Sequence, residues 1–278
     1  MTTKTPGKPA APARPSAAAD AKPATAQATA ATPVAPPGYR PLTPFDKKKH
    51  AGMGLETHRN YRWAAELNAM FVNAAEFGRA ALDYPLVFVR APGAVEPLPA
   101  AVLSLEARRN LFVDAEGRWR ASAYVPAYAR RHPFCIVQLP GEKTGDPARN
   151  LVCVEDDALV AGAKPLLDAN GEPTAEWAPL LKMMEAMEAA RTQTAAFGQR
   201  LDVLGLLTPF DALALPNSAK PLRLQGMLRV DEAKLAKLDP RELKNLLSRG
   251  ELRAIYAHLL SLENFAKLLD LSQAARGN

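Results

Sequence analysis

Two short apolar runs, FCIVQL at residues 134–139 and LVCVE at residues 151–155, give the clearest indication of the fold. Each is rich in residues that favour strands and is bounded by turn-forming residues, which is typical of a β-strand. Four runs of the same kind precede them: LVFVR (86–90), AVLSL (101–105), NLFVD (110–114) and WRASAYV (119–125). The short Gly-containing turn at residues 114–117 favours a hairpin between the last two runs. The sequence therefore predicts a strand-rich region over residues 85–155.

The segment before these strands is less clear. Residues 61–71 fit the two-residue period of a strand and the wider period of a helix equally well. Asn73 and Glu76 have the spacing of a capping box and predict a helix start, which the turn at residues 83–85 closes. Residues 38–50 are expected to be an extended lead-in.

After residue 155 the spacing becomes helical. From Trp177 apolar residues recur every three or four positions to about Leu207, which predicts a helix that Pro209 stops. Gly198 and Gly205 count against one unbroken helix.

Later helices are marked by their boundary residues. A short apolar run at residues 222–230 leads to a predicted helix start at Asp231. A second start is expected at Asp239-Pro240, because Asp caps a helix and Pro suits its first turn. Gly250 ends that helix, and residues 251–271 predict further amphipathic helix. Since strands come first and helices later, we expect an α+β fold, with a strand-rich, mostly antiparallel N-terminal half packed with a helical C-terminal half.

Residues 1–37 differ in composition from the rest of the chain. They contain 13 Ala and 8 Pro and no aromatic residue, so they offer almost nothing to bury. The sequence therefore predicts a disordered Ala/Pro-rich tail at 1–37 and a single domain at 38–278. Pro, Lys and Asp interrupt every window that could form the apolar core of a signal peptide. No run of about 18 apolar residues occurs, so no transmembrane helix is expected, and the cytoplasm is the default compartment.

Charge argues against nucleic acid as a partner. The chain has a net charge of +6, of which the tail supplies about half, and the basic residues of the domain are mostly interleaved with acidic ones. The two cysteines, Cys135 and Cys153, lie inside apolar runs and are expected to be buried, reduced thiols. A disulfide would require the two strands to be adjacent.

Familiar catalytic and metal-binding motifs are missing from the sequence. It has no paired metal-binding histidine motif, no Cys-x-x-Cys, no phosphate loop and no Gly-x-Ser-x-Gly elbow. His50 and His58 are expected to be solvated in a polar segment. His258 is expected to lie on a helix and to pack against the rest of the fold. Asp156 and Asp157 follow a strand and predict a turn. We therefore expect no metal and no cofactor, and the sequence leans away from an enzyme.

One cluster of residues could carry function. Residues 110–134 combine aromatic side chains, two prolines, Arg130, Arg131 and His132. One interpretation is a hairpin whose aromatic residues enter the core. The other is an exposed, rigid loop in which Arg130, Arg131 and His132, beside Tyr124, bind an anionic group. On an extended segment at most one of the two arginines would face the packed surface.

These residues also carry a family resemblance. The block YVPAYARRHPF (124–134) follows EF (76–77), YPLVF (84–88), NLF (110–112) and GRW (117–119). In the C-terminal part come GMLRVDE (226–232), GEL (250–252) and IYAHLLSL (255–262). In this order, over about residues 38–270, the sequence resembles the bacterial SapC family. His132 departs from the pattern at a place where Tyr is at least as familiar.

The resemblance implies an accessory protein associated with the transport or assembly of bacterial surface-layer proteins. It supplies no catalytic residue and no cofactor. We therefore expect a non-enzymatic interaction protein whose partner is another protein of the cell envelope or export pathway. The alternative is an enzyme acting on a peptide or protein, with a site assembled from residues distant in the sequence.

Overall fold

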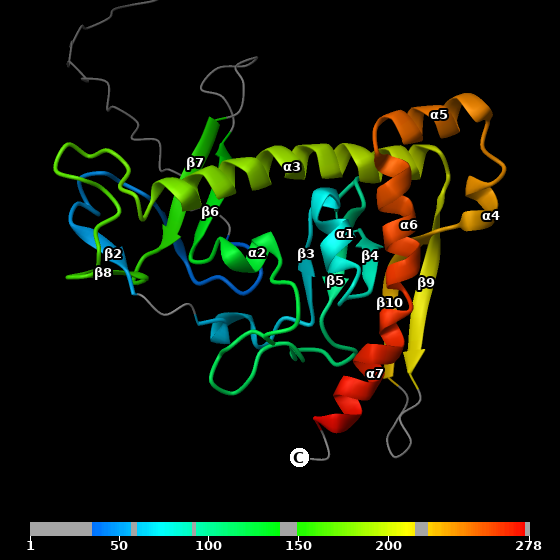
Figure 1. Cartoon of the computed structure of the whole chain (residues 1–278), viewed down its shortest axis with the longest axis horizontal. Coiled ribbons are helices and arrows are strands. Elements are labelled where there is room, and N and C mark those ends of the chain that lie inside the picture. The colour runs from blue at the N-terminus through cyan, green and yellow to red at the C-terminus, as the bar shows by residue number, and fades with distance from the viewer. Residues whose placement is uncertain (1–34, 57–59, 91–92, 140–148, 215–221, 276–278) are drawn as a thin grey trace, which may run out of the picture. The chain divides into compact units, whose positions relative to one another are not determined.

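The computed structural model describes residues 35–56, 60–90, 93–139, 149–214 and 222–275, and these form a mixed α+β fold, as expected (Figure 1). All strand pairs between the named strands are antiparallel. The largest sheet has five strands, in the order β3 (Ala69–Phe71), β5 (Leu98–Val102), β4 (Leu86–Val89), β10 (Leu222–Val230) and β9 (Leu207–Ala214).

A second sheet has the order β1 (Leu42–Pro44), β7 (Arg149–Glu155) and β6 (Phe134–Leu139). The predicted strands at 134–139 and 151–155 are thus confirmed as a pair. Cys135 and Cys153 lie directly opposite each other in this pair, and both are free and fully buried. A third sheet pairs β2 (Met53–Leu55) with β8 (Leu159–Ala161).

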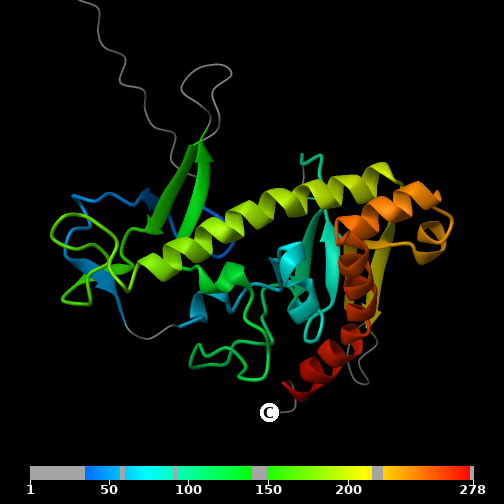
Figure 2. The same cartoon turned by 45° about the horizontal axis from the view of Figure 1, so that its top comes forward.

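The long helix α3 (Ala178–Val203) connects the two larger sheets. It contacts β5 in the five-stranded sheet and β6 in the three-stranded sheet, and Figures 1 and 2 show it running beside both. The other helical segments are η1 (Arg62–Ala64), η2 (Ala74–Glu76), α1 (Phe77–Ala80), α2 (Ala127–Arg130), α4 (Glu232–Leu235), α5 (Pro240–Ser248), α6 (Glu251–Ser261) and α7 (Asn264–Ala274). The expected starts after Asp231 and Asp239 are confirmed, since each side chain accepts backbone hydrogen bonds from the first turn that follows.

Helix α3 is unbroken through Gly198, contrary to what the glycine suggested. A glycine is needed at this position because the Pro97 backbone lies very close to α3. A Cβ added at Gly198 would lie 2.1 Å from the carbonyl oxygen of Pro97. The glycine therefore lets α3 pack tightly against the chain that enters β5.

A Gly198→Ala substitution is expected to destabilise the protein, although alanine normally favours a helix by about 1 kcal/mol over glycine. The clash with the Pro97 backbone should reverse that gain and lower the free energy of unfolding by about 1 to 3 kcal/mol. Urea unfolding of the two proteins measures the difference. An alanine variant as stable as the parent would show that α3 does not pack this closely.

Two expectations about local structure are wrong, and one open alternative is resolved. The runs at 110–114 and 119–125 do not form a hairpin of strands, because only a single bridge joins Val113 to Trp119. The apolar side chains of these two runs pack into the core although their backbone lies in loops. Pro209 does not stop the preceding helix, which ends at Val203 before Gly205, a residue with φ 67°; Pro209 lies within β9, an edge strand in which proline is tolerated. The ambiguous segment at 61–71 contains both types, the turn η1 and the strand β3.

The N-terminal tail falls mostly outside the described residues, which begin at Ala35. The domain extends a little further toward the N-terminus than position 38. Pro37 lies in contact with it, because its carbonyl oxygen accepts a hydrogen bond of 2.6 Å from the Tyr128 hydroxyl.

Candidate functional site

Helix α2 and the residues around it hold every side chain that the sequence singled out as a binding group. The buried carboxylate of Glu76, at the end of η2, anchors this region. Its Oε1 accepts hydrogen bonds from the Ala127 backbone N–H at 2.7 Å and from the Tyr124 hydroxyl at 2.8 Å. Its Oε2 accepts from the Asn73 backbone N–H at 3.0 Å. One glutamate thus ties the start of α1 to the start of α2.

Arg130, the last residue of α2, is held by Tyr124. The Arg130 Nη2 donates to the Tyr124 hydroxyl oxygen at 3.2 Å, and the guanidinium lies 5.8 Å from the centre of the tyrosine ring. Burial, and then the negative charge of Glu76, raise the pKa of Tyr124 to about 12, so this hydroxyl stays protonated. Tyr124 can therefore donate to Glu76 and accept from Arg130 at the same time.

Arg130 has no acidic partner among the residues that the structure describes. Its Nε is buried and makes no hydrogen bond, and the side chain as a whole is half-buried. The Nε is enclosed, so this guanidinium, which has no balancing carboxylate in the described part of the chain, is suited to binding an anion through its terminal nitrogens.

Arg131 has a different role from the one expected. Its side chain is only 7% exposed, its guanidinium lies 4.7 Å from the ring centre of Tyr128, and its Nε donates to the Tyr39 hydroxyl at 3.2 Å. The expectation that both arginines belong to an exposed, extended loop is wrong, because residues 127–130 are helical and Arg131 follows directly. Arg131 therefore faces the core, where aromatic rings stabilise its charge.

His132 lies two residues after the end of α2 and is half-buried. Its ring stacks on Trp63 with centres 4.2 Å apart, and its Nε2 lies 3.1 Å from Oε1 of the buried Glu155. Arg40 also donates to Glu155, from its backbone N at 2.9 Å and its Nε at 3.1 Å. Burial opposes the charged form of Glu155, but the hydrogen bonds from His132 and Arg40 outweigh it and lower the pKa of this carboxyl.

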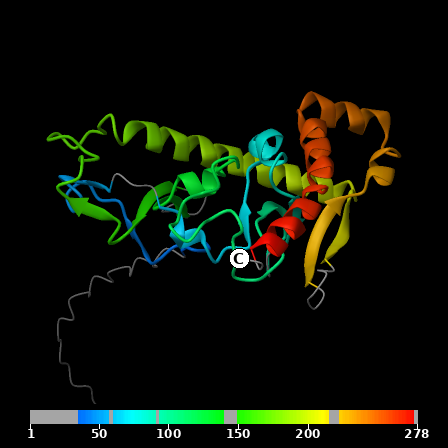
Figure 3. The same ribbon diagram turned by 60° about the horizontal axis from the view of Figure 1, so that its bottom comes forward.

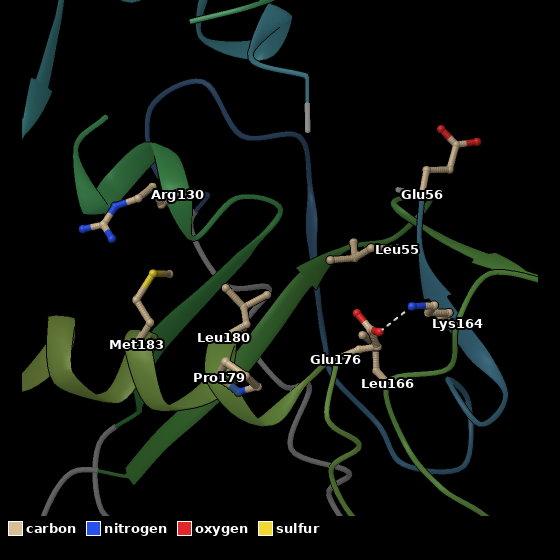
Figure 4. Close-up of a pocket in the computed structure, with 9 residues that line it drawn as sticks. All are labelled: Leu55, Glu56, Arg130, Lys164, Leu166, Glu176, Pro179, Leu180 and Met183. Carbon is tan, nitrogen blue, oxygen red and sulfur yellow. Dashed lines mark hydrogen bonds and ion pairs between the residues drawn. The ribbon is translucent and has the colours of Figure 1, made fainter. Parts of the chain in front are cut away.

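A pocket of about 440 Å³ opens beside Arg130, and we call it the Arg130 trough. Its lining is drawn in Figure 4 and comprises Leu55, Glu56, Arg130, Lys164, Leu166, Glu176, Pro179, Leu180 and Met183. Arg130 and Met183 lie at one end, and the ion pair of Lys164 with Glu176, 2.9 Å long, lies at the other. The trough thus has apolar walls, with Arg130, which has no acidic partner among the described residues, at one end and the ion-paired Lys164 at the other.

A second pocket of about 360 Å³, the His132 pocket, adjoins the first. Both pockets are lined by Leu55, Glu56 and Leu180. The remaining lining of the His132 pocket is Arg40, Asn60, Tyr61, Trp63, Ala129, His132, Pro133, Glu155, Asp157, Ala158 and Val160. Of the four predicted binding residues, Arg130 therefore lines one pocket and His132 lines the other. Tyr124 lines neither pocket but holds Arg130 by a hydrogen bond, and Arg131 is buried.

Residues that the sequence did not place in the site complete it. Glu76 was expected to act as a helix cap and belonged to one element of the family pattern, and Trp63, Glu155 and Glu56 were not expected to be binding residues. They come from segments distant in sequence, which local patterns do not reveal. Asp156 and Asp157 follow β7 in a turn, as expected, and pair with Lys49 and Arg40, each at 2.5 Å.

The other candidate histidines are structural or lie outside the description. His50 is not solvated as expected, because it is 1% exposed, stacks on Phe45 and accepts a hydrogen bond from the Asp46 backbone N–H at 3.0 Å. Burial lowers its pKa. His58 lies outside the described residues. Within the described ranges, no group of three or more His, Cys, Asp or Glu side chains could hold a metal ion.

The family model SapC matches residues 45–268, which include α2, the whole lining of the Arg130 trough and the lining of the His132 pocket except Arg40. This chain belongs to the SapC family. The match agrees with the resemblance expected over about residues 38–270. No curated protein and no solved structure matches the chain. Over the described residues, no helix is both long enough and apolar enough to cross a membrane.

Proposed function

We propose that this SapC-family chain is an accessory protein that binds a protein of the bacterial cell envelope, in the transport or assembly of surface-layer proteins. The family membership supports this class of partner. The observation that carries the proposal is Arg130, a half-buried guanidinium at the end of an apolar trough with no acidic partner among the described residues. In this proposal Arg130 binds a carboxylate on the partner.

The arrangement around Arg130 favours a binding role because the cation is fixed before a ligand arrives. Tyr124 holds its Nη2, and Glu76 holds Tyr124, so little side-chain freedom is left to lose on binding. Lys164 is paired with Glu176, so Arg130 is the cation of the trough lining that is left to pair with a carboxylate of the partner. The apolar walls formed by Leu180 and Met183 suit an apolar neighbour of that carboxylate.

Replacing Arg130 by glutamine is expected to weaken binding of a surface-layer protein from the same bacterium by about 10- to 100-fold. A hydrogen bond to a charged group contributes about 1.5 to 3 kcal/mol, which corresponds to that range. Isothermal titration calorimetry with the purified proteins measures the change. Stability should fall by less than about 1 kcal/mol, because Arg130 contributes only one hydrogen bond and is partly exposed.

Arg223→Gln serves as the matched control, since this exposed arginine pairs with Asp211 on the β9–β10 hairpin and lines neither pocket. It should leave affinity unchanged. If no surface-layer protein binds the unmodified chain, or if Arg130→Gln binds as well as the parent, the proposed function is refuted.

One observation favours an enzyme as the second candidate. His132 and Glu155 form a hydrogen-bonded pair at the wall of a pocket, an arrangement that can serve as a general acid and base. Mass spectrometry of peptides incubated with the protein tests this alternative. A product that forms with the parent protein and not with His132→Gln would establish it.

A further inference from the structure

The Arg130 trough and the His132 pocket adjoin each other at three lining residues that belong to both. They share Leu55, Glu56 and Leu180, so a ligand that lies on these side chains extends into both. Two of the three shared residues are apolar. The middle of such a ligand therefore meets a mainly apolar surface.

The trough end is positive. Arg130 has no acidic partner among the described residues, whereas the charge of Lys164 is balanced by Glu176 at 2.9 Å. Figure 4 shows Arg130 and Glu56 at opposite sides of the drawn lining, with Leu55 and Leu180 between them.

The end of the His132 pocket is negative. Arg40 pairs with Glu155 at 3.1 Å and with Asp157 at 2.5 Å, so one cation serves two carboxylates. Glu56 adds a further carboxylate, for which the described part of the chain provides no ion pair. Its exposed side chain lies where a cationic group of a ligand could approach it.

We propose that the two pockets together bind an extended peptide segment with opposite charges at its ends. The segment places a carboxylate at Arg130, apolar residues over Leu55 and Leu180, and a basic side chain at Glu56. An extended peptide advances about 3.3 Å per residue, so the separation of the two charges along the segment sets which peptide fits. This inference rests on the proposed function for Arg130 and adds the polarity of the partner segment.

The test uses N-acetylated peptides of alanine that end in leucine and carry lysine two, three or four positions before it. Three matched changes are made to each peptide: the C-terminal carboxylate becomes an amide, lysine becomes norleucine, or the carboxylate is moved to a glutamate side chain ahead of an amidated leucine. The last peptide distinguishes a chain terminus from an acidic side chain as the source of the carboxylate. Calorimetry with the full chain gives the dissociation constants.

At the best spacing, we expect the amide to bind about tenfold or more weakly than the acid, with the difference lost in Arg130→Gln. Norleucine in place of lysine should weaken binding about threefold, as for an exposed ion pair. Glu56→Gln should weaken binding of the lysine peptide by the same factor and leave binding of the norleucine peptide unchanged. The substitution in the protein and the one in the peptide each remove the same ion pair between Glu56 and lysine. Glu66→Gln, an exposed glutamate that pairs with Arg108 outside both pockets, is the control.

The outcomes separate the two proposals. If acids are preferred through Arg130 but lysine and norleucine peptides bind equally, the inferred polarity is wrong and the Arg130 site stands. A preference for lysine that survives Glu56→Gln also overturns it. Equal binding of acid and amide, or no binding at millimolar concentration, overturns the inference together with the Arg130 site as a carboxylate site.

Discussion

Replacing Trp119 by alanine is expected to lower the free energy of unfolding by about 3 to 5 kcal/mol, the usual cost of removing a buried large aromatic side chain. Trp119 is 8% exposed, and its indole Nε1 donates to the hydroxyl of the fully buried Tyr84 at 3.0 Å. The Tyr84 hydroxyl donates in turn to the backbone carbonyl of Tyr124. The substitution would therefore leave a cavity and also weaken the support of the segment that leads into α2. Urea unfolding at neutral pH measures the loss.

Trp119→Phe separates the two contributions. It keeps most of the apolar volume but removes the indole N–H, so we expect a smaller loss of about 1 to 2 kcal/mol. A loss below about 1 kcal/mol for Trp119→Ala would mean that this side chain is not part of the core. Arg130→Gln provides the contrast, since it should impair binding with little effect on stability.

The parts of the fold that could be predicted from sequence are those fixed by local patterns. The strands at 134–139 and 151–155 are apolar runs that pair with each other in one sheet, and the caps at Asp231 and Asp239 act within one turn of helix. The hairpin predicted around residues 114–117 failed for a physical reason. Buried loops, like strands, alternate apolar and polar residues, and Trp119 is buried without belonging to a strand.

The candidate site could be predicted only in part, because its residues act through contacts that are distant in sequence. Arg130 and His132 stood out by their types and spacing. Glu76, which holds Arg130 in place through Tyr124, bonds to residues 48 and 51 positions away. The burial of Arg131 depends on Tyr39 and Tyr128, and a helical rather than extended backbone at 127–130 decides which way each arginine points.

His258 illustrates a polar residue whose role follows entirely from its surroundings. It lies on α6, which packs against β10 and β4, and Figure 3 shows α6 beside β10. Its Nε2 accepts from the backbone N–H of Val230 in β10 at 3.0 Å, and its Nδ1 donates to the carbonyl of Leu86 in β4 at 2.8 Å. The imidazole thus bridges the two strands and is neutral. Burial, and to a lesser extent the charge of Arg229, lower its pKa to about 4, although its hydrogen bond to Leu86 opposes the shift.

This lowered pKa predicts that the protein loses stability as the pH falls below the ordinary histidine pKa of about 6.5. Between that value and about pH 4 the unfolded chain binds a proton at His258 and the folded chain does not, so protonation favours unfolding. The contribution amounts to about 1.4 kcal/mol per pH unit, or about 2 kcal/mol between pH 6.5 and pH 5. Urea unfolding across this range measures it, above the pH at which most carboxyl groups titrate.

His258→Gln is the variant that identifies the source of this pH dependence. Glutamine cannot titrate, so the variant should be less stable than the parent at pH 7, where the bridge between Val230 and Leu86 is disturbed, but should lose less stability on acidification. The buried His50 also has a lowered pKa, and His50→Gln therefore measures the part of the slope that does not come from His258. If His258→Gln keeps the full slope of the parent between pH 6.5 and pH 5, the imidazole is not held neutral between the strands, and the bridge does not account for the acid sensitivity of the fold.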